Sequence, residues 1–155
     1  MTTPTLSRSF RVIDASGLVA FLTHEREGAA VAAWVASWQR SGRTVHAPEL
    51  ARYEVANVLT RLAVSGQLDA HDVREPWTVL QALPIAFHPL DDGPSTVALA
   101  LRLERRTAWD ASYLAPAESL GAELFTLDGP LARNVRQRSL PVRSLLERPP
   151  DLPDE

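Results

Sequence analysis

Four acidic residues stand where a carboxylate is unusual or well placed for chemistry. Asp14 and Asp128 each follow a short apolar segment, whereas Glu54 and Asp110 each interrupt the apolar face of an expected helix. Carboxylate oxygens are the ligands that Mg²⁺ and Mn²⁺ prefer, and like charges in one pocket repel one another unless a cation lies between them. We therefore take Asp14, Glu54, Asp110 and Asp128 as candidate ligands of one metal site.

Glu54 is the acid whose position is hardest to explain structurally. A helix is expected over residues 49–65, and a 3.6-residue period places Glu54 on the same face as the apolar Val58. A carboxylate buried in such a stripe costs several kcal/mol unless it is paired or holds a cation. A buried ion pair with Arg52 or Arg11 is the alternative to a metal.

The other three acids also have structural explanations. Asp14 is a possible cap for the helix after it, Asp128 begins an Asp-Gly-Pro turn, and Asp110 is a first-turn acid that the helix dipole favours. Taken together they favour a shared site, because all four acids are expected at one end of a sheet. The chain also contains no Lys that could neutralise any of them.

Composition excludes several chemistries. The chain has no Cys and its 16 basic residues are all Arg, so thiolate catalysis, cysteine zinc sites, Schiff bases and the P-loop are excluded. The four histidines show no metal-ligand spacing, and we assign them structural or surface roles; they are His24, His46, His71 and His88. The net charge of −3 argues against nonspecific coating of nucleic acid, but arginines are concentrated late in the chain.

Short apolar segments alternate with helical patterns along the chain, which is typical of a parallel sheet of about five strands with helices on both faces. Such α/β sheets bind ligands at the carboxyl ends of their strands. The expected strands are 10–13, 44–47, 85–88, 123–127 and 140–143. The expected helices are 17–22, 29–40, 49–65, 69–84 with an interruption at Pro76, 95–105, 108–120 with Thr107 as its cap, and a short one ending at 136.

The length of 155 residues fits a single domain, residues 1–155, with an ordered core over about 10–146. The proline- and acid-rich tail from Arg148 is expected to be disordered. No segment approaches the roughly 20 apolar residues of a membrane span, and a cytosolic protein is expected. Trp34, Trp38 and Trp77 are interpreted as core or interface anchors, with the core favoured.

Four segments in order resemble the PIN-domain ribonucleases, and most closely their VapC-type toxins of toxin–antitoxin pairs. They are V-I-D-A-S at 12–16, P-E-L-A-R-Y-E-V-A-N-V-L at 48–59, W-D-A-S-Y-L-A-P-A at 109–117 and T-L-D-G-P-L-A at 126–132. The resemblance extends over residues 10–146 and implies a PIN-like three-layer fold. Pro116 departs from the pattern, and we expect it to kink its helix after Asp110.

The resemblance implies an Mg²⁺- or Mn²⁺-dependent endoribonuclease that hydrolyses RNA phosphodiester bonds. The four acids would then be its catalytic and metal-binding residues, with Ser16 and Thr126 orienting ligands or water. Flanking phosphates would contact Arg133, Arg136 and Arg138, for which a solvated helix face is the alternative. A cognate antitoxin and a homodimer are further implications. The rival interpretation is an inactive PIN-like binding module acting through protein contacts, against which the retention of all four acids argues.

Overall fold

Five short strands form one parallel sheet in the computed structural model, which describes residues 9–23 and 26–151. The order across the sheet is β3-β2-β1-β4-β5, and each neighbouring pair is parallel. The strands are β1 (Phe10–Ile13), β2 (Thr44–Pro48), β3 (Ile85–His88), β4 (Glu123–Thr126) and β5 (Val142–Ser144). This arrangement confirms the predicted α/β fold with a central parallel sheet.

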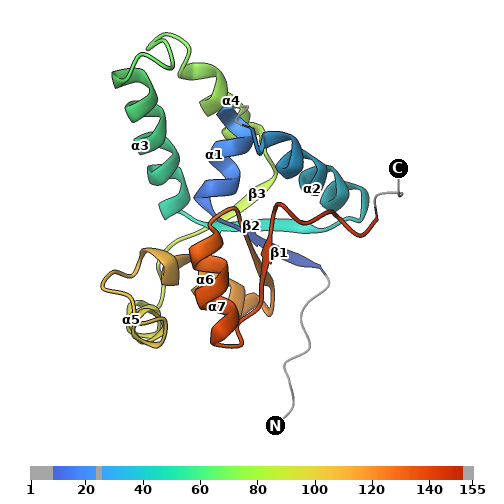
Figure 1. Cartoon of the computed structure of the whole chain (residues 1–155), viewed down its shortest axis with the longest axis vertical. Coiled ribbons are helices and arrows are strands. Elements are labelled where there is room, and N and C mark those ends of the chain that lie inside the picture. The colour runs from blue at the N-terminus through green and yellow to red at the C-terminus, as the bar shows by residue number, and fades with distance from the viewer. Residues whose placement is uncertain (1–8, 24–25, 152–155) are drawn as a thin grey trace.

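Seven helices cover the two faces of the sheet in the part of the chain that is described. Helices α1 to α4 lie on one side and α5 to α7 on the other (Figure 1). Helix α6 packs against β1, β2 and β4, so it crosses the centre of the sheet. The helices are α1 (Ala15–Thr23), α2 (Gly28–Arg40), α3 (Leu50–Val64), α4 (Arg74–Ala82), α5 (Gly93–Arg102), α6 (Trp109–Leu120) and α7 (Gly129–Gln137).

The central strands are apolar because both of their faces are covered. Val12 on β1 and Leu124 on β4 are fully buried, as expected for parallel strands between two helical layers. On the α2 side, Trp34 and Trp38 pack edge-on against Phe125, with ring centroids 5.1 and 4.9 Å from that of Phe125. The prediction that these two tryptophans are core residues is confirmed.

Among the predicted helix bounds that differ from the structure, the starts of α4 and α6 are the informative ones. Helix α4 begins at Arg74 and not at Asp69, so Pro76 falls in its first turn, where a missing backbone N–H breaks no helical bond. Pro76 therefore does not interrupt the helix. Helix α6 begins at Trp109, and its cap residue is Ala108 without a side-chain hydrogen bond, so Thr107 is not the cap.

Pro116 does not end helix α6, which continues to Leu120. The helix stops at Gly121, which adopts the left-handed conformation (φ 59°) that glycine tolerates without strain. The first turn of α6, with Asp110, precedes the proline by more than a turn. Pro116 therefore lies outside the turn that carries Asp110.

The expectation of disorder from Arg148 onward is wrong for the start of that segment. The Trp34 indole donates a hydrogen bond to the Glu147 carbonyl (2.8 Å), and the Ser37 hydroxyl donates one to Asp151 (2.5 Å). Arg40 forms an ion pair with the same carboxylate (3.2 Å). These contacts hold the segment against α2; residues 152–155 lie outside the described part of the chain. No helix in the described part is long and apolar enough to cross a membrane.

Candidate functional site

Two of the candidate acids meet where the strand order of the sheet reverses. Asp14 directly follows β1, and Asp128 comes two residues after β4, the strand beside it. The Asp14 amide donates a hydrogen bond to the Phe125 carbonyl (3.1 Å), which extends the pairing to this point. Crossover helices leave toward opposite faces here, so the carboxyl ends of the two strands border an open crevice. The sequence-based placement of Asp14 and Asp128 at this edge agrees with the structure.

Asp14 is a buried carboxylate that accepts three hydrogen bonds. Its side chain accepts bonds from the Ser16 hydroxyl (2.5 Å), from the Gly17 amide (3.1 Å) and from the Thr126 hydroxyl. Burial raises the pKa of Asp14 to about 6; these hydrogen bonds oppose the rise, and the charge of Asp128 adds to it. A cation bound beside Asp14 would offset the free-energy cost of burying its negative charge.

Ser16 and Thr126 fix the two strand ends to each other. Each hydroxyl that donates to Asp14 also accepts a backbone bond: Thr126 from the Asp128 amide (2.8 Å) and Ser16 from the Leu127 amide (3.0 Å). Thr126 is completely buried. The two residues therefore set the rotamer of Asp14 and the path of the chain between β4 and α7.

Asp128 has the structural role that its turn motif indicates, and it has an electrostatic role as well. Its carboxylate accepts a hydrogen bond from the Leu131 amide (2.9 Å) and caps α7. Its charge also raises the pKa values of both Asp14 and Asp110. The three carboxylates therefore share one electrostatic environment.

Asp110 lies in the first turn of α6 and is about one-third exposed. Burial raises its pKa, the nearby Arg105 opposes the rise, and Asp128 adds to it. Arg105 forms an ion pair with it (2.9 Å). Asp110 therefore has a basic partner, an arginine, although the chain contains no Lys.

Glu54 lies at the edge of the buried stripe of α3 and not at its centre, which corrects the sequence-based placement. The buried positions of the helix are Ala51, Val55 and Leu59, and Glu54 is partly exposed beside them. The helix is rotated from the expected orientation: it packs against α1 and β2, and the face that carries Ala51, Val55 and Leu59 is the buried one. Glu54 is thereby turned toward the crevice.

The partner of Glu54 is neither of the arginines considered from the sequence. The Tyr113 hydroxyl donates a hydrogen bond to Glu54, whereas the Arg52 guanidinium stacks on the Phe87 ring, 4.2 Å from its centroid. Arg11 bonds to the carbonyl of Phe10 (2.6 Å). A buried ion pair is therefore not the explanation for Glu54.

Tyr113 is a site residue that sequence reasoning missed. It is 4% exposed and stands one helical turn after Asp110 on α6. Burial, the hydrogen bond to Glu54 and the charges of Glu54 and Asp14 all raise its pKa, so the phenol stays protonated and donates. The three-residue spacing from Asp110 was visible in the sequence, but its contact with α3, 59 positions away, was not.

The donor chemistry of these residues fits a hard divalent cation. The groups are carboxylates and hydroxyls, and Asp14 is a buried acid that bears its charge at a cost. Within residues 9–23 and 26–151, no three His, Cys, Asp or Glu side chains are grouped closely enough to hold one ion. Tyr113 contacts Glu54, and Arg105 contacts Asp110.

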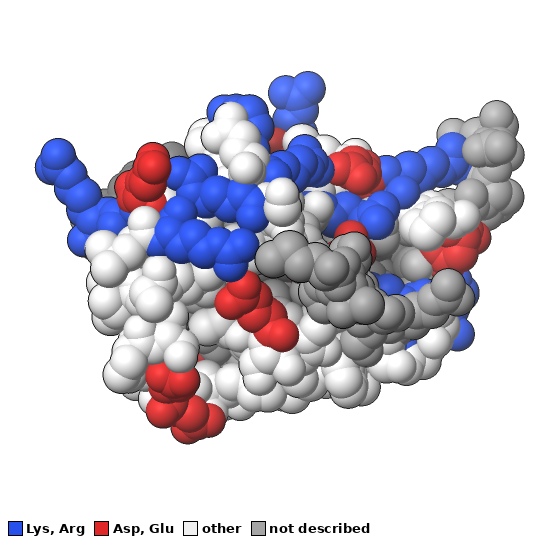
Figure 2. Space-filling view, turned by 90° about the horizontal axis from the view of Figure 1, so that it is seen from below, with Lys and Arg blue, Asp and Glu red and all other residues white. Residues whose placement is uncertain are grey.

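The three predicted RNA-binding arginines differ in their surroundings. The guanidinium of Arg133 lies against Gly129, where an added Cβ would be 3.3 Å from its Nη1, and this is the start of the helix that Asp128 caps. Arg136 is paired with Glu147 (2.9 Å) and is half exposed. Arg138 is mostly buried and bonds to Asn134 and to the Arg102 carbonyl (2.6 Å), a structural role that disfavours RNA contact. The face toward α5–α7 carries arginines with acids among them (Figure 2).

Two of the histidines that the sequence left scattered are in contact. His46 Nδ1 and His88 Nε2 are 2.8 Å apart across β2 and β3, and the rings stack. Burial lowers the pKa of His46, and so does the charge of His88. Parallel pairing in this register brings them together, which spacing along the chain does not reveal.

The comparison with protein families gives the site its context. The model of the PIN domain matches residues 11–136, a span that contains all four acids. The chain belongs to the PIN domain family. Among its PIN relatives, Ribonuclease VapC3 of Pyrobaculum aerophilum is 34% identical over 78% of this chain and 91% of its own. Ribonuclease VapC12 of Mycobacterium tuberculosis is 32% identical over 79% and 90%.

A solved structure agrees with the PIN fold. The crystal structure of PAE2754 from Pyrobaculum aerophilum superimposes with a TM-score of 0.60 at 27% identity, over 88% of this chain and 91% of the other. The predicted resemblance to PIN proteins and to VapC ribonucleases is thus confirmed.

Proposed function

We propose that this chain is a divalent-metal-dependent endoribonuclease of the VapC type, a toxin that a cognate antitoxin neutralises. The observation that carries the proposal is the buried Asp14 carboxylate at the end of β1, beside Asp128 at the end of the neighbouring strand β4. The VapC relatives are named ribonucleases, which supports RNA as the substrate.

Four acids would hold the ion: Asp14, Glu54, Asp110 and Asp128. When bound, Mg²⁺ or Mn²⁺ supplies Lewis acidity that activates water and stabilises the charge that develops on a phosphate during hydrolysis. Ser16 and Thr126 keep Asp14 in one orientation, and Tyr113 keeps Glu54 beside the crevice. Arg133 is the arginine of α7 best placed for a flanking phosphate, with Arg136 available if it leaves its exposed ion pair.

The test is RNA cleavage by the purified chain under defined metal conditions. We expect a panel of structured RNAs to be cut with Mn²⁺ or Mg²⁺, cutting to stop on addition of EDTA, and activity to return when the metal is restored. Cleavage that persists in EDTA would contradict the metal dependence. A chain that cuts no RNA but binds a partner protein would instead support the inactive binding module.

The proposal includes two partners, the antitoxin and a second copy of the chain. The resemblance to VapC-type toxins supports the antitoxin, and a homodimer would extend the groove along which RNA would lie. Co-expression with a candidate antitoxin tests the first, because a neutralising antitoxin should co-purify and suppress cleavage. Sedimentation of the chain alone tests the second.

Replacing Tyr113 with Phe should lower metal affinity and cleavage about 10- to 100-fold, because partners that orient a metal ligand typically contribute that much. The ring still fills its buried volume, and only the hydroxyl that holds Glu54 is lost. Metal titration by calorimetry and cleavage rates at saturating metal measure the two effects. Tyr53→Phe is the matched control, since Tyr53 lies on the same helix as Glu54 with a side chain 69% exposed.

Glu54→Gln distinguishes a ligand from a structural carboxylate. Gln has the same volume and still accepts from Tyr113, so the fold should persist while metal affinity and cleavage fall. A variant with unchanged metal affinity would remove Glu54 from the site. If Tyr113→Phe also cleaved RNA normally, neither Glu54 nor Tyr113 would belong to the site.

A further inference from the structure

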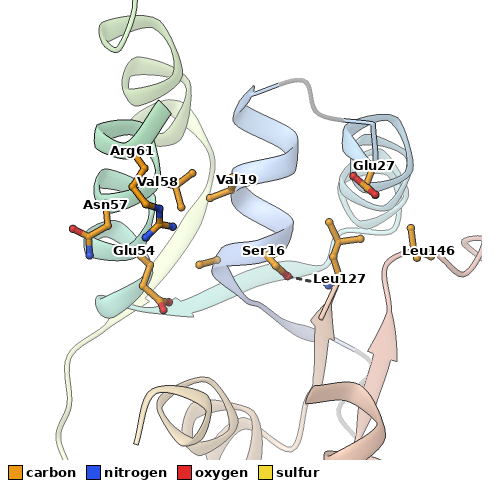
Figure 3. Close-up of a pocket in the computed structure, with 10 residues that line it drawn as sticks. Ser16, Val19, Glu27, Glu54, Asn57, Val58, Arg61, Leu127 and Leu146 are labelled. Carbon is orange, nitrogen blue, oxygen red and sulfur yellow. Dashed lines mark hydrogen bonds between the residues drawn. The ribbon is translucent and has the colours of Figure 1, made fainter. Parts of the chain in front are cut away.

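A cleft of about 460 Å³ opens next to the buried acids, along helices α1 and α3 (Figure 3). Figure 3 shows α1, with Ser16 and Val19, in the middle of the cleft and α3, with Glu54, Asn57 and Arg61, on one side; Glu27, Leu127 and Leu146 line the other side. We call this hollow the α1–α3 cleft. It shares Ser16 and Glu54 with the candidate site, so a ligand in the cleft is continuous with one at the acids.

The polar wall of the α1–α3 cleft is built by helical spacing. Glu54, Asn57 and Arg61 are separated by three and then four residues, so they lie along one face of α3. Side chains on a helix lean toward its N-terminus, and Figure 3 shows the Arg61 side chain extending along α3 toward the end that carries Glu54. One cationic and one amide group thus follow the acid along the cleft.

Arg61 is the one basic residue among those that line the α1–α3 cleft, where Glu27 and Glu54 are the acids. Within the described residues its guanidinium has no ion-pair or hydrogen-bond partner, whereas Arg105, Arg136 and Arg138 are each paired. An arginine that is left solvated beside a site for a phosphodiester has all five donors available to phosphate oxygens.

We propose that Arg61, assisted by Asn57, binds the RNA phosphate that neighbours the scissile one, and that the α1–α3 cleft is where that strand leaves the acids. This proposal rests on the proposed ribonuclease function. RNA is favoured over an acidic peptide as the occupant, because the same strand must pass Glu54 to reach the acids. With the metal bound there, Arg61 is the next positive charge along the wall of the cleft.

The test is RNA binding and cleavage by Arg61→Ala, compared with Arg74→Ala. Arg74 is exposed on α4, outside the α1–α3 cleft, so its loss removes the same surface charge without touching the wall. We expect Arg61→Ala to raise KM about tenfold with kcat little changed, and Arg74→Ala to change neither. Arg61→Lys keeps a positive charge but lacks the planar guanidinium, so its KM should lie between those of the two alanine variants.

Salt dependence gives a readout that does not depend on turnover. In a cleavage-deficient Asp14→Asn background, single-stranded RNA affinity is measured by fluorescence anisotropy at several salt concentrations. Loss of one phosphate contact should lower the slope of log K against log salt by about 0.7 for Arg61→Ala and leave it unchanged for Arg74→Ala. Asn57→Ala should weaken binding by a smaller factor.

The outcomes distinguish the Arg61 phosphate contact from the ribonuclease function on which it rests. If the wild-type chain cleaves RNA but Arg61→Ala keeps its KM and salt slope, the phosphate contact is overturned and the ribonuclease stands. If Arg61→Ala loses binding of a poly-glutamate peptide and keeps binding of RNA, Arg61 belongs to a protein interface and the RNA contact is overturned. A wild-type chain that neither binds nor cuts RNA overturns both.

Discussion

Replacing Asp14 with asparagine is expected to reduce RNA cleavage at least about a thousandfold while the chain stays folded. The amide has nearly the volume of the carboxylate, and its oxygen still accepts from Ser16 and from the Gly17 amide. The negative charge that a cation requires is lost. Initial cleavage rates at saturating Mn²⁺, with circular dichroism to confirm the fold, measure the effect.

A matched control for Asp14→Asn is Asp92→Asn. Asp92 also caps a helix, accepting a bond from the Ser95 amide (2.9 Å), but it is exposed at the start of α5. Its replacement should leave cleavage unchanged, because Asn caps helices as well as Asp does. If Asp14→Asn kept full cleavage activity after contaminating metal had been removed from the buffer, Asp14 would be excluded as a metal ligand.

The stability of the metal-free protein is expected to depend on pH through Asp14. Its pKa is 3.8 in the unfolded chain and about 6 in the native state, so the native state binds the proton more tightly. The associated stability is present below pH 4 and is lost as the pH rises through 6. In EDTA, the free energy of unfolding of Asp14→Asn relative to that of the wild type should therefore rise by on the order of 2 to 3 kcal/mol as the pH increases from 4 to 7.

Urea unfolding of both proteins in EDTA, at pH 4 and at pH 7, measures that difference. Taking the difference between the two proteins cancels the other carboxylates that titrate in this range, including Asp110. Adding Mn²⁺ at pH 7 should then stabilise the wild type and leave Asp14→Asn unchanged, by mass action on the native state. A stability difference that is the same at both pH values would show that Asp14 is not a strained carboxylate.

The sheet was predictable because its signals are local. Short segments with apolar centres, such as Val12-Ile13 and Leu124-Phe125, sit between helical patterns, and burial from both sides favours apolar residues there. The start of α4 was not predictable in this way. Asp69 resembles a cap, and its side chain does accept a bond from the His71 amide (2.8 Å), but that bond closes a turn and not a helix.

The candidate site was likewise predictable only in part from the sequence. Asp14 and Asp128 follow from strand ends, since the fold brings adjacent parallel strands to one edge. The contact of Glu54 with Tyr113 depends on how α3 is rotated and how α6 lies across the sheet, and neither is encoded by spacing within one segment. The pairing of His46 with His88 likewise required the register of two strands.

The hydroxyl bridges between β1 and β4 make the site observable without substrate. The amides of Gly17, Leu127 and Asp128 each donate to a side-chain oxygen of Asp14, Ser16 or Thr126, and not to a backbone carbonyl. Their solvent exchange is thus governed by the same network that orients the buried carboxylate. Deuterium uptake at these three amides would report when that network opens, and would separate a variant that loosens the site from one that only removes a charge.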